Sequence, residues 1–253
     1  AVLKDRKKAT VKAFLRSIPP RLVETIESYC CDMYDGYINA AKEVFGRRVN
    51  IVIDRFHVAK HYRDGLDSLR KREMRRLKKT LSEEEYQSLK GVMWALRKRP
   101  GQLKKEDHAL LKRLFEYSPL LKEAYHYQHQ LTNLFDANIT PQVAARRMRR
   151  WINRVQKSTL TCFDKFIKTL NKHWRIILTY FNDRVTSGFV EGLNNKIKVI
   201  KRRCYGIFNI EQTVPKNLLR LGRIRVIPVI LNMFKITGNT KEPVFSLYRV
   251  SLS

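Results

Sequence analysis

Two aspartates follow predicted strands at positions where carboxylates could hold a divalent cation. Asp32 comes after the run that ends at Cys31, and Asp54 comes after the β-branched run that ends at Ile53. The carboxyl ends of parallel strands face the functional crevice of an α/β sheet, so these two carboxylates could share one hard cation. The plainer interpretation of each residue alone is that it caps the helix that follows.

A third carboxylate, Glu191, lies early on a predicted helix that is rich in amide and basic side chains. Asn194, Asn195 and Lys198 follow Glu191 on the same helix face. The side chains of this segment that could hold phosphates are Asn194, Asn195, Lys196, Lys198, Lys201, Arg202 and Arg203. Glu191 is either a surface salt-bridge partner or a metal ligand beside a nucleic-acid backbone. The paired asparagines, which are poor packing residues, favour the second interpretation.

These three acids together indicate metal-assisted chemistry on phosphodiesters. Two cations about 3.5–4 Å apart can activate the attacking oxygen and stabilise the leaving oxygen of a phosphodiester. Carboxylates suit Mg²⁺ and Mn²⁺, which are therefore the cofactors to expect. One acid would be weak support, whereas two strand-end aspartates and a glutamate on a basic helix are a more specific combination.

The charge of the chain points to a polyanionic partner. Of the 253 residues, 52 are Lys or Arg and 23 are Asp or Glu, which gives a formal net charge of +29. Such an excess repels itself unless a polyanion is present, and binding to nucleic acid is driven by the release of counterions from phosphates. We therefore expect nucleic acid as the partner.

Other classes of partner fit the sequence less well. The basic residues run through the whole chain and form no single amphipathic patch, and no apolar run approaches the ~18 residues of a transmembrane helix, so we expect no membrane association. An RNA-binding protein would explain the charge but not the acids, and the aromatic residues fall mostly at core spacing. The four cysteines lack the spacing of a zinc site and are expected to be reduced thiols in a cytosol.

The elements that position the acids form a strand–helix–strand pattern followed by a long helical stretch. Residues 22–31 end as a strand, residues 35–46 have the spacing of an amphipathic helix, and residues 49–53 are a β-branched strand. This pattern is typical of a parallel βαβ unit. The segments expected to be helical after it are 56–79, 82–99, 105–117, one that starts at 119, 141–155 and 158–182. The predicted fold class is α/β and predominantly helical.

Three segments carry a resemblance to a known family. They are Cys31–Tyr34, Ile53–Lys60 and Thr186–Lys198, and the shorter phrases Met93–Lys98 and Phe163–Phe166 add to them. On these residues the chain resembles the bacterial insertion-sequence transposases of the ISL-three group, which are DDE transposases. The resemblance covers roughly residues 1–209.

The resemblance implies a ribonuclease-H-like catalytic core that is interrupted by an all-helical insertion and that cuts and rejoins DNA strands. It implies DNA at the ends of an insertion element as the substrate, a homo-oligomer assembled on that DNA, and a cytoplasmic, nucleoid-associated location in a bacterium. The implied organisation is a partial core over 1–55, the insertion over 56–182, a return to the core over 183–209, and a divergent or out-of-frame tail over 210–253.

The resemblance also implies a role for each acid. Glu191 corresponds to the last acid of the triad and Asp32 to the second, and both would ligate Mg²⁺ or Mn²⁺. Asp54 would either brace the site or contact the metal, and His57 and Lys60 of the same motif would support it. A lone histidine such as His57 is, however, more often structural.

The first acid of the triad has no counterpart in this sequence. In such cores it lies on the first strand, but the acids before Asp32 are Asp5, Glu24 and Glu27, and Asp5 sits in a basic run ahead of a helix. We therefore expect a catalytic-core fragment that lacks its amino-terminal part and is inactive alone. The alternative is a non-catalytic DNA-binding remnant or repressor, because electrostatic binding does not need the triad.

Overall fold

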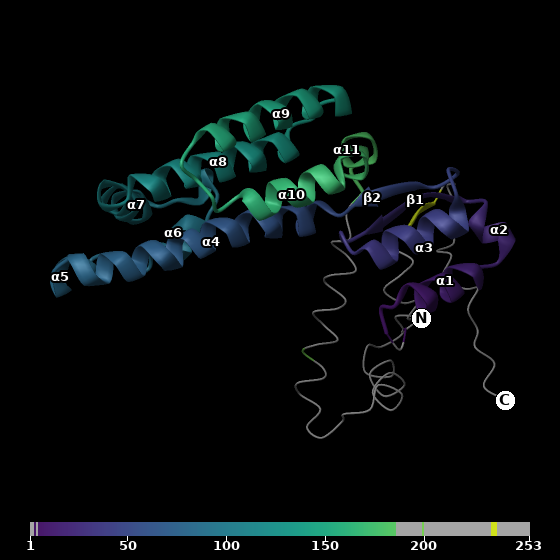
Figure 1. Ribbon diagram of the computed structural model, residues 1–253, viewed down its shortest axis with the longest axis horizontal. Helices are drawn as coiled ribbons and strands as arrows, with labels where there is room; N and C mark the ends of the chain where they lie inside the picture. The colour runs from purple at the N-terminus through teal and green to yellow at the C-terminus, as the bar shows by residue number, and fades with distance from the viewer. Residues whose placement is uncertain (1–2, 4, 186–198, 200–233, 237–253) are drawn as a thin grey trace, which may run out of the picture. The chain divides into compact units, whose positions relative to one another are not determined.

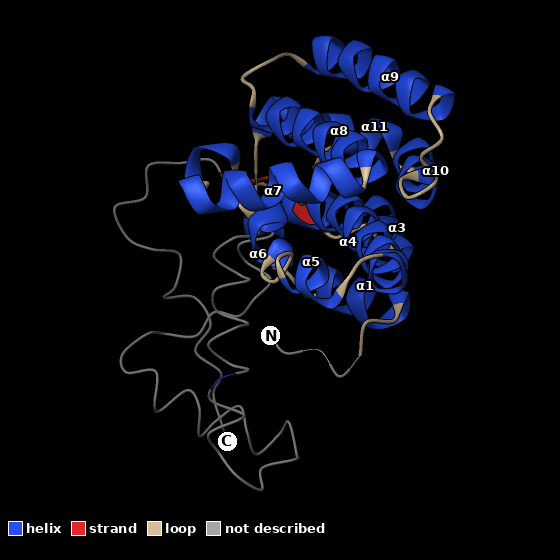
Figure 2. Ribbon diagram, turned by 90° about the vertical axis from the view of Figure 1, so that its left-hand side faces the viewer, coloured by secondary structure: helices blue, strands red, loops and turns tan. Residues whose placement is uncertain are grey.

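The computed structural model of the chain describes residue 3, residues 5–185, residue 199 and residues 234–236. Two compact units make up the chain: residues 1–56 with 183–253, and residues 57–182. Helices dominate the described residues and strands are few (Figures 1 and 2), so the prediction of a mainly helical chain is confirmed.

The first unit contains the predicted strand–helix–strand pattern. Its elements are α1 (Lys8–Arg16), α2 (Pro20–Val23), β1 (Ile26–Cys31), α3 (Asp35–Phe45), β2 (Asn50–Ile53) and β3 (Phe234–Ile236). The strand order is β2-β1-β3, in which β1 pairs with β2 in parallel and with β3 antiparallel. The parallel βαβ unit is therefore confirmed. The strand begins only at Ile26, because Pro20 fits the first position of the short helix α2.

The central position of β1 explains its composition. All of its residues except Glu27 are buried, including Tyr29, Cys30 and Cys31, as expected of a strand that is covered on both faces. Helix α3 contacts both strands and packs on α1. Lys8 and Lys12 of α1 both form ion pairs with Glu43 of α3, in addition to the apolar contact between the two helices.

The second unit is a set of helices. They are α4 (Arg55–Thr80, which begins at the end of the first unit), α5 (Glu83–Gln87), α6 (Val92–Arg97), the 3₁₀ turn η1 (Pro100–Gln102), α7 (Lys105–Tyr117), α8 (Pro119–Asp136), α9 (Pro141–Lys157), α10 (Asp164–Lys172) and α11 (Trp174–Asp183). Helices α8 and α9 lie side by side (Figure 1). None of the described helices is both long and apolar enough to cross a membrane.

The helix starts predicted near residues 82, 119 and 141 are confirmed, but two predicted helices are interrupted. The Ser82 hydroxyl accepts from Glu85 N in a capping box, and Ser118 and Thr140 cap the helices that follow them. The helix expected over 82–99 is interrupted between Gln87 and Val92, and Gly91 in this interval has a left-handed φ of 94°. The helix expected over 158–182 begins only at Asp164 and is divided at His173 into α10 and α11.

Aromatic side chains form the core of the helical unit. The Trp151 ring lies 5.4 Å from that of Phe163 and 6.0 Å from that of Phe166, which in turn lies 5.6 Å from Tyr62. The Trp151 indole donates a hydrogen bond of 2.9 Å to the Tyr127 carbonyl, so its polar atom is satisfied. These rings join α4, α9 and α10. The aromatic residues of this cluster are thus core residues, as their spacing predicts.

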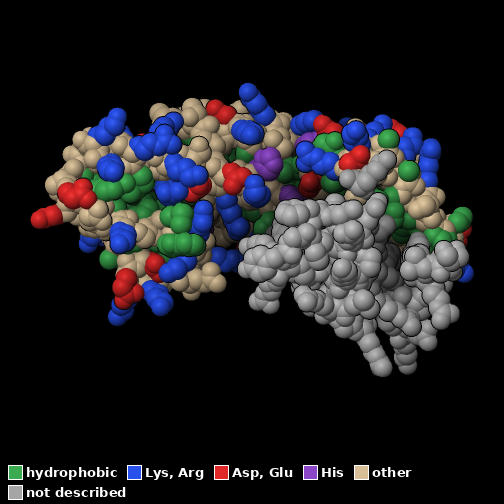
Figure 3. Space-filling model, turned by 90° about the horizontal axis from the view of Figure 1, so that it is seen from below, with side chains coloured by type: hydrophobic (Ala, Val, Ile, Leu, Met, Phe, Trp, Pro, Cys, Tyr) green, Lys and Arg blue, Asp and Glu red, His purple; other side chains and the backbone are tan. Residues whose placement is uncertain are grey.

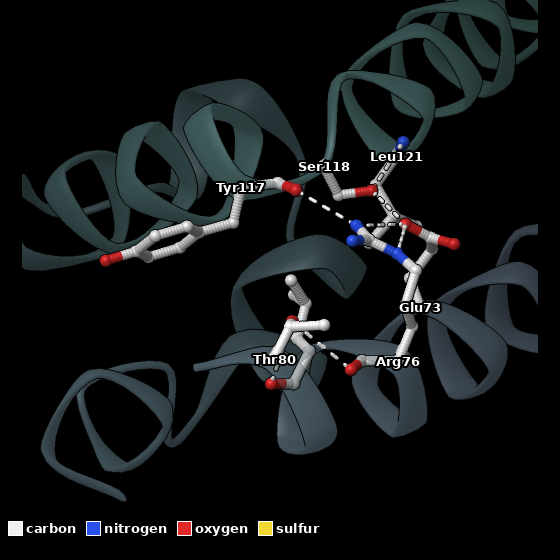
Figure 4. A network of polar contacts seen from close by, with 7 residues as sticks. Glu73, Arg76, Thr80, Tyr117, Ser118 and Leu121 are labelled. Atoms are coloured by element: carbon white, nitrogen blue, oxygen red, sulfur yellow. Dashed lines mark hydrogen bonds and ion pairs between the residues drawn. The ribbon is translucent and has the colours of Figure 1, made fainter. Parts of the chain in front are cut away.

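A buried carboxylate also ties α4 to the junction of α7 and α8 (Figure 4). Glu73 accepts a hydrogen bond of 2.7 Å from the Ser118 hydroxyl and one of 2.9 Å from Arg76 Nη2. Arg76 Nη2 also donates to the Tyr117 carbonyl at 3.0 Å. Because a buried charge is costly unless it is paired, these bonds are what allow Glu73 to lie between the helices.

Candidate active site

Two of the predicted acids lie at the same edge of the sheet. Asp32 directly follows β1 and Asp54 directly follows β2, and the last residues of these parallel strands, Cys31 and Ile53, are register partners. Asp54 N donates a hydrogen bond of 2.8 Å to the Cys31 carbonyl, which extends the pairing by one step. The sheet therefore places both aspartates at adjacent carboxyl ends of strands.

Each aspartate also closes a turn ahead of a helix. Asp32 Oδ1 accepts from Tyr34 N at 2.9 Å, just before α3, and Asp54 Oδ1 accepts from Phe56 N at 3.0 Å, at the start of α4. The capping role is thus present in the structure. A carboxylate that closes a turn can still bind a cation, because an ionised carboxylate has about four lone-pair positions.

The surroundings of the two aspartates disfavour further negative charge. Asp54 is 1% exposed, whereas Asp32 is half-buried. Burial, with the Asp54 charge as a second cause, raises the pKa of the Cys30 thiol to about 12. The pKa of Cys31 is also raised well above its ordinary value, first by burial and then by Cys30, Asp32 and Asp54. Both thiols are therefore neutral near pH 7, and the aspartates are the groups at this edge that could attract a cation.

His57 and Lys60 lie on the first turns of α4. His57 is half-buried, and Lys60 forms an exposed ion pair of 3.0 Å with Asp64 on the next turn. A pair that is open to solvent contributes little to stability. The supporting role predicted for these two residues stays a prediction.

The remaining predicted site residues lie outside the described residues. They are Glu191, Asn194, Asn195, Lys196, Lys198, Lys201, Arg202 and Arg203. In the described ranges no group of three or more His, Cys, Asp or Glu side chains is arranged to hold a metal ion. Two aspartates at neighbouring strand ends offer hard oxygen donors of the kind that Mg²⁺ and Mn²⁺ prefer, so the residues present fit part of such a site.

The structure also shows charged residues that the sequence analysis did not single out. Lys and Arg side chains are spread over the described surface seen in Figure 3, and acidic side chains are fewer there. Arg72, Arg75 and Lys165 line one groove of the helical unit. Helical spacing could have identified Arg72 and Arg75 of α4 as neighbours, because residues three positions apart lie on the same face of a helix.

Comparison with known proteins identifies the class. A protein-family model described as transposase matches residues 1–214, which is most of the chain and includes Asp32, Asp54 and Glu191. That family is the ISL3 group of DDE transposases, and the chain belongs to it. The family predicted from the three sequence segments is therefore confirmed.

Curated relatives agree with this assignment. Over 202 residues the chain is 27% identical to the transposase for insertion sequence element IS1001 of Bordetella parapertussis. This alignment covers 79% of the present chain and 49% of that transposase. It is 24% identical over 139 residues to the transposase for insertion sequence element IS1557 of Mycobacterium tuberculosis, covering 55% of this chain and 31% of that protein. The chain thus spans about half or less of these relatives. No solved structure matches the chain.

Proposed function

We propose that this chain supplies the strand-end aspartates and the glutamate-bearing helix of a transposase core that cuts DNA and transfers strands. The observation that carries the proposal is the parallel β1–β2 pair, which brings Asp32 and Asp54 to adjacent strand ends in a chain of the transposase family. The core would be ribonuclease-H-like, with residues 1–55 and 183–209 in it and residues 56–182 as its helical insertion. The two compact units of the chain support this division.

Asp32 and Glu191 would hold Mg²⁺ or Mn²⁺, and Asp54 would brace the site or contact the same cation. Bound cations would stabilise charge on the attacking and leaving oxygens of a phosphodiester. The hydrogen bonds from Tyr34 N to Asp32 and from Phe56 N to Asp54 fix the two carboxylates in orientation before any cation arrives. Carboxylates that are already oriented would not have to reorganise when a cation binds or when the reaction takes place.

The basic segment that follows Glu191 would position the DNA. Lysine and arginine contacts to phosphates fix the register of a protein on a duplex and carry no sequence information. The residues assigned to this role are Asn194, Asn195, Lys196, Lys198, Lys201, Arg202 and Arg203. DNA at the element ends, assembly of several copies on that DNA and location at the nucleoid stay predictions of the resemblance.

A triad needs one more acid on a first core strand, and Asp5 does not supply it. Asp5 lies ahead of α1, not on a strand, and its Oδ1 accepts from Lys7 N at 2.9 Å. We therefore expect that the chain alone does not cut DNA and that an amino-terminally extended chain does. The net charge of +29 favours one second candidate, a non-catalytic DNA-binding protein, because electrostatic binding needs only the positive surface.

The test is cleavage and strand transfer on plasmid DNA with Mg²⁺ or Mn²⁺, using the chain and the extended chain. In the extended chain, Asp32→Asn and Glu191→Gln should lower activity roughly 100-fold or more, the scale of losing one electrostatic group at a reaction centre. Asp32→Asn keeps an oxygen that can cap Tyr34 N, so the fold is retained. Glu106→Gln, at an exposed acid on α7, is the matched control and should retain activity.

Each outcome decides between the candidates. Full activity in the Asp32→Asn or Glu191→Gln variant would overturn the assigned site. Cleavage by the chain alone that depends on Glu191 would support the site and overturn the expectation of a missing acid. If neither chain cuts but both bind DNA, the non-catalytic candidate is the correct one.

A further inference from the structure

A groove of about 750 Å³ runs along one face of α4 within the helical unit. Its other wall is the start of α10 and the segment before it, which contribute Thr161, Cys162, Lys165 and Phe166. Most of the side chains that line it are charged or polar. The groove lies wholly within residues 57–182 and contains none of the acids assigned to catalysis.

The spacing of residues along α4 builds the floor of the groove. His61, Gly65, Ser68, Arg72 and Arg75 recur every three or four residues and so share one face of the helix. From His61 to Arg75 this face extends about 21 Å at 1.5 Å per residue.

Gly65 sets how closely the second wall approaches this face. A Cβ at position 65 would lie less than 3.0 Å from the Cys162 carbonyl oxygen, a separation that real Cβ atoms essentially never show. The chain at Cys162 therefore rests directly on the backbone of α4. This contact holds the start of α10, and with it Lys165, beside the stripe of α4 residues.

The cations of the groove differ from their neighbours on the same helix. On adjacent faces of α4, Arg70 pairs with Asp67 at 2.8 Å and Arg76 pairs with Glu73 at 2.9 Å. By contrast, no ion pair within the described part of the chain joins an acid to the groove cations Arg72, Arg75 and Lys165.

The balance of charge in the groove is positive. Its lining contains four Lys or Arg side chains and one carboxylate, that of Asp64, which is paired with Lys60 at 3.0 Å. Burial lowers the pKa of His61; Asp64 opposes this effect, while Lys60, Lys165 and His57 add to it. His61 is therefore neutral at pH 7 and can take part as a hydrogen-bonding group. The groove attracts anions and has cations on both walls to hold them.

We infer that this groove of the helical unit binds the phosphodiester backbone of DNA. The inference rests on the proposed function for DNA as the partner. Arginine holds phosphate oxygens with two parallel hydrogen bonds, and lysine acts on them as a point charge. One strand of B-DNA carries one phosphate per 3.4 Å of duplex axis, so a face of about 21 Å corresponds to roughly six phosphates of that strand, which is enough to engage Arg72, Arg75 and Lys165 at once.

The experiment measures affinity of the full chain for a short random-sequence DNA duplex between about 50 and 200 mM salt. The groove variant is Arg72→Gln/Arg75→Gln/Lys165→Gln. Its charge-matched control is Lys78→Gln/Lys79→Gln/Lys90→Gln, at exposed positions of the same unit outside the groove. The slope of log affinity against log salt should fall by about one for each phosphate that the protein no longer neutralises, so by about three in the groove variant and by less in the control.

A third variant separates charge from shape. Arg72→Lys/Arg75→Lys/Lys165→Arg keeps the three cations and should keep the slope of the wild-type chain. Equal slopes for the groove variant and the lysine control would overturn the inference. If thermal melting shows that the triple variant is unfolded, Arg75→Gln and Lys165→Gln are measured singly, and each should lower the slope by about one.

The same variants separate this inference from the catalytic proposal. If the extended chain cuts DNA in a Glu191-dependent way while the groove variant binds like the control, the groove assignment fails and the proposed function stands. A second outcome is that the slope of log affinity against log salt falls in the groove variant, while Asp32→Asn leaves the cleavage activity of the extended chain unchanged. The groove assignment then stands and the catalytic assignment fails. If the groove variant lost affinity for an acidic peptide but kept the salt slope of the wild-type chain for DNA, the groove would bind acidic peptides and the inference would be overturned.

Discussion

Glu73 is a carboxylate that the helical unit buries to 7% exposure. Burial alone would raise its pKa, but the hydrogen bonds from Arg76 and Ser118 and the charges of Arg76 and Arg72 outweigh this effect, so the pKa is lowered. Glu73 is therefore ionised at neutral pH. Its contribution to stability depends on its hydrogen-bond donors. One of these, the Ser118 hydroxyl, comes from the junction of α7 and α8.

We predict that Ser118→Ala destabilises the chain more than Thr140→Ala does. Both serve as N-caps, and loss of a cap alone costs about 1 kcal/mol. Ser118→Ala also removes a donor to a buried carboxylate, a loss of about 1.5–3 kcal/mol, for a total of roughly 2–4 kcal/mol. Urea unfolding of the two variants measures the difference. Equal losses would show that Glu73 acquires another donor when Ser118 is removed.

Local sequence predicts the caps but not this buried pair. Ser82, Ser118 and Thr140 are each a capping residue followed by a good helix start, and that signal lies within four residues. Arg76 is a local partner of Glu73, but the Ser118 donor is 45 residues away, so local sequence does not predict that Glu73 is buried between helices. Asp32 and Asp54, like the caps, can be predicted from local sequence, because the pattern of residues indicates where a strand ends.

At the scale of the element, Gly65 decides how α4 meets the start of α10. We predict that Gly65→Ala destabilises the helical unit, although alanine favours a helix by about 0.5–1 kcal/mol. The added Cβ would lie less than 3.0 Å from the Cys162 carbonyl oxygen, and this atom belongs to the backbone and cannot rotate away. Overpacking of this kind costs about 1–3 kcal/mol, so the net loss is expected to be about 1–2 kcal/mol.

The control for this prediction is Gly101→Ala. Nothing lies within 4 Å of a Cβ at Gly101, so that substitution should change the free energy of unfolding by less than about 0.5 kcal/mol. Thermal unfolding of both variants provides the comparison. A more stable Gly65→Ala chain would mean that the segment at Cys162 moves away without cost, and that its close approach to α4 is not a constraint.

The elements also show where periodicity fails as a guide. The apolar spacing continues across Gly91 and across His173, so it predicts single helices over 82–99 and 158–182. Between Gln87 and Val92 the helix is interrupted, and Gly91, which has a left-handed backbone there, is the local signal for the interruption. At His173 no glycine or proline marks the break. His173 is itself buried, and single-sequence patterns do not contain information about tertiary packing.

At the scale of the whole molecule, the family match reaches across both compact units. Residues 1–214 include the strands that precede Asp32 and Asp54 and all of the helical unit. The helical unit is therefore part of what this family shares. The groove cations Arg72, Arg75 and Lys165 and the strand-end acids all lie within the residues that the family model matches.

The whole chain should lose stability as the pH falls below about 4. Its ion-paired or hydrogen-bonded carboxylates have lowered pKa values in the folded state, and those of Glu43, Asp67, Glu73, Glu85 and Asp107 are the clearest cases. A lowered folded pKa gives stability that is present above the unfolded value, about 4, and lost as the pH falls through the folded value. Protonation also increases the net positive charge, and the resulting self-repulsion acts in the same direction.

Glu43 offers the sharpest test of this dependence. Hydrogen bonds from Lys12 and then Lys8 lower its pKa to about 2, so its pairs between α1 and α3 persist until the pH approaches that value. Glu43→Gln should lower the melting temperature at pH 7 and make much less difference near pH 2, where about half of the wild-type carboxylate is itself protonated. Glu106→Gln, at an exposed acid on α7, should follow the wild-type curve throughout. A Glu43→Gln deficit that is the same at both pH values would mean that the shape of the side chain, and not its charge, holds α1 on α3.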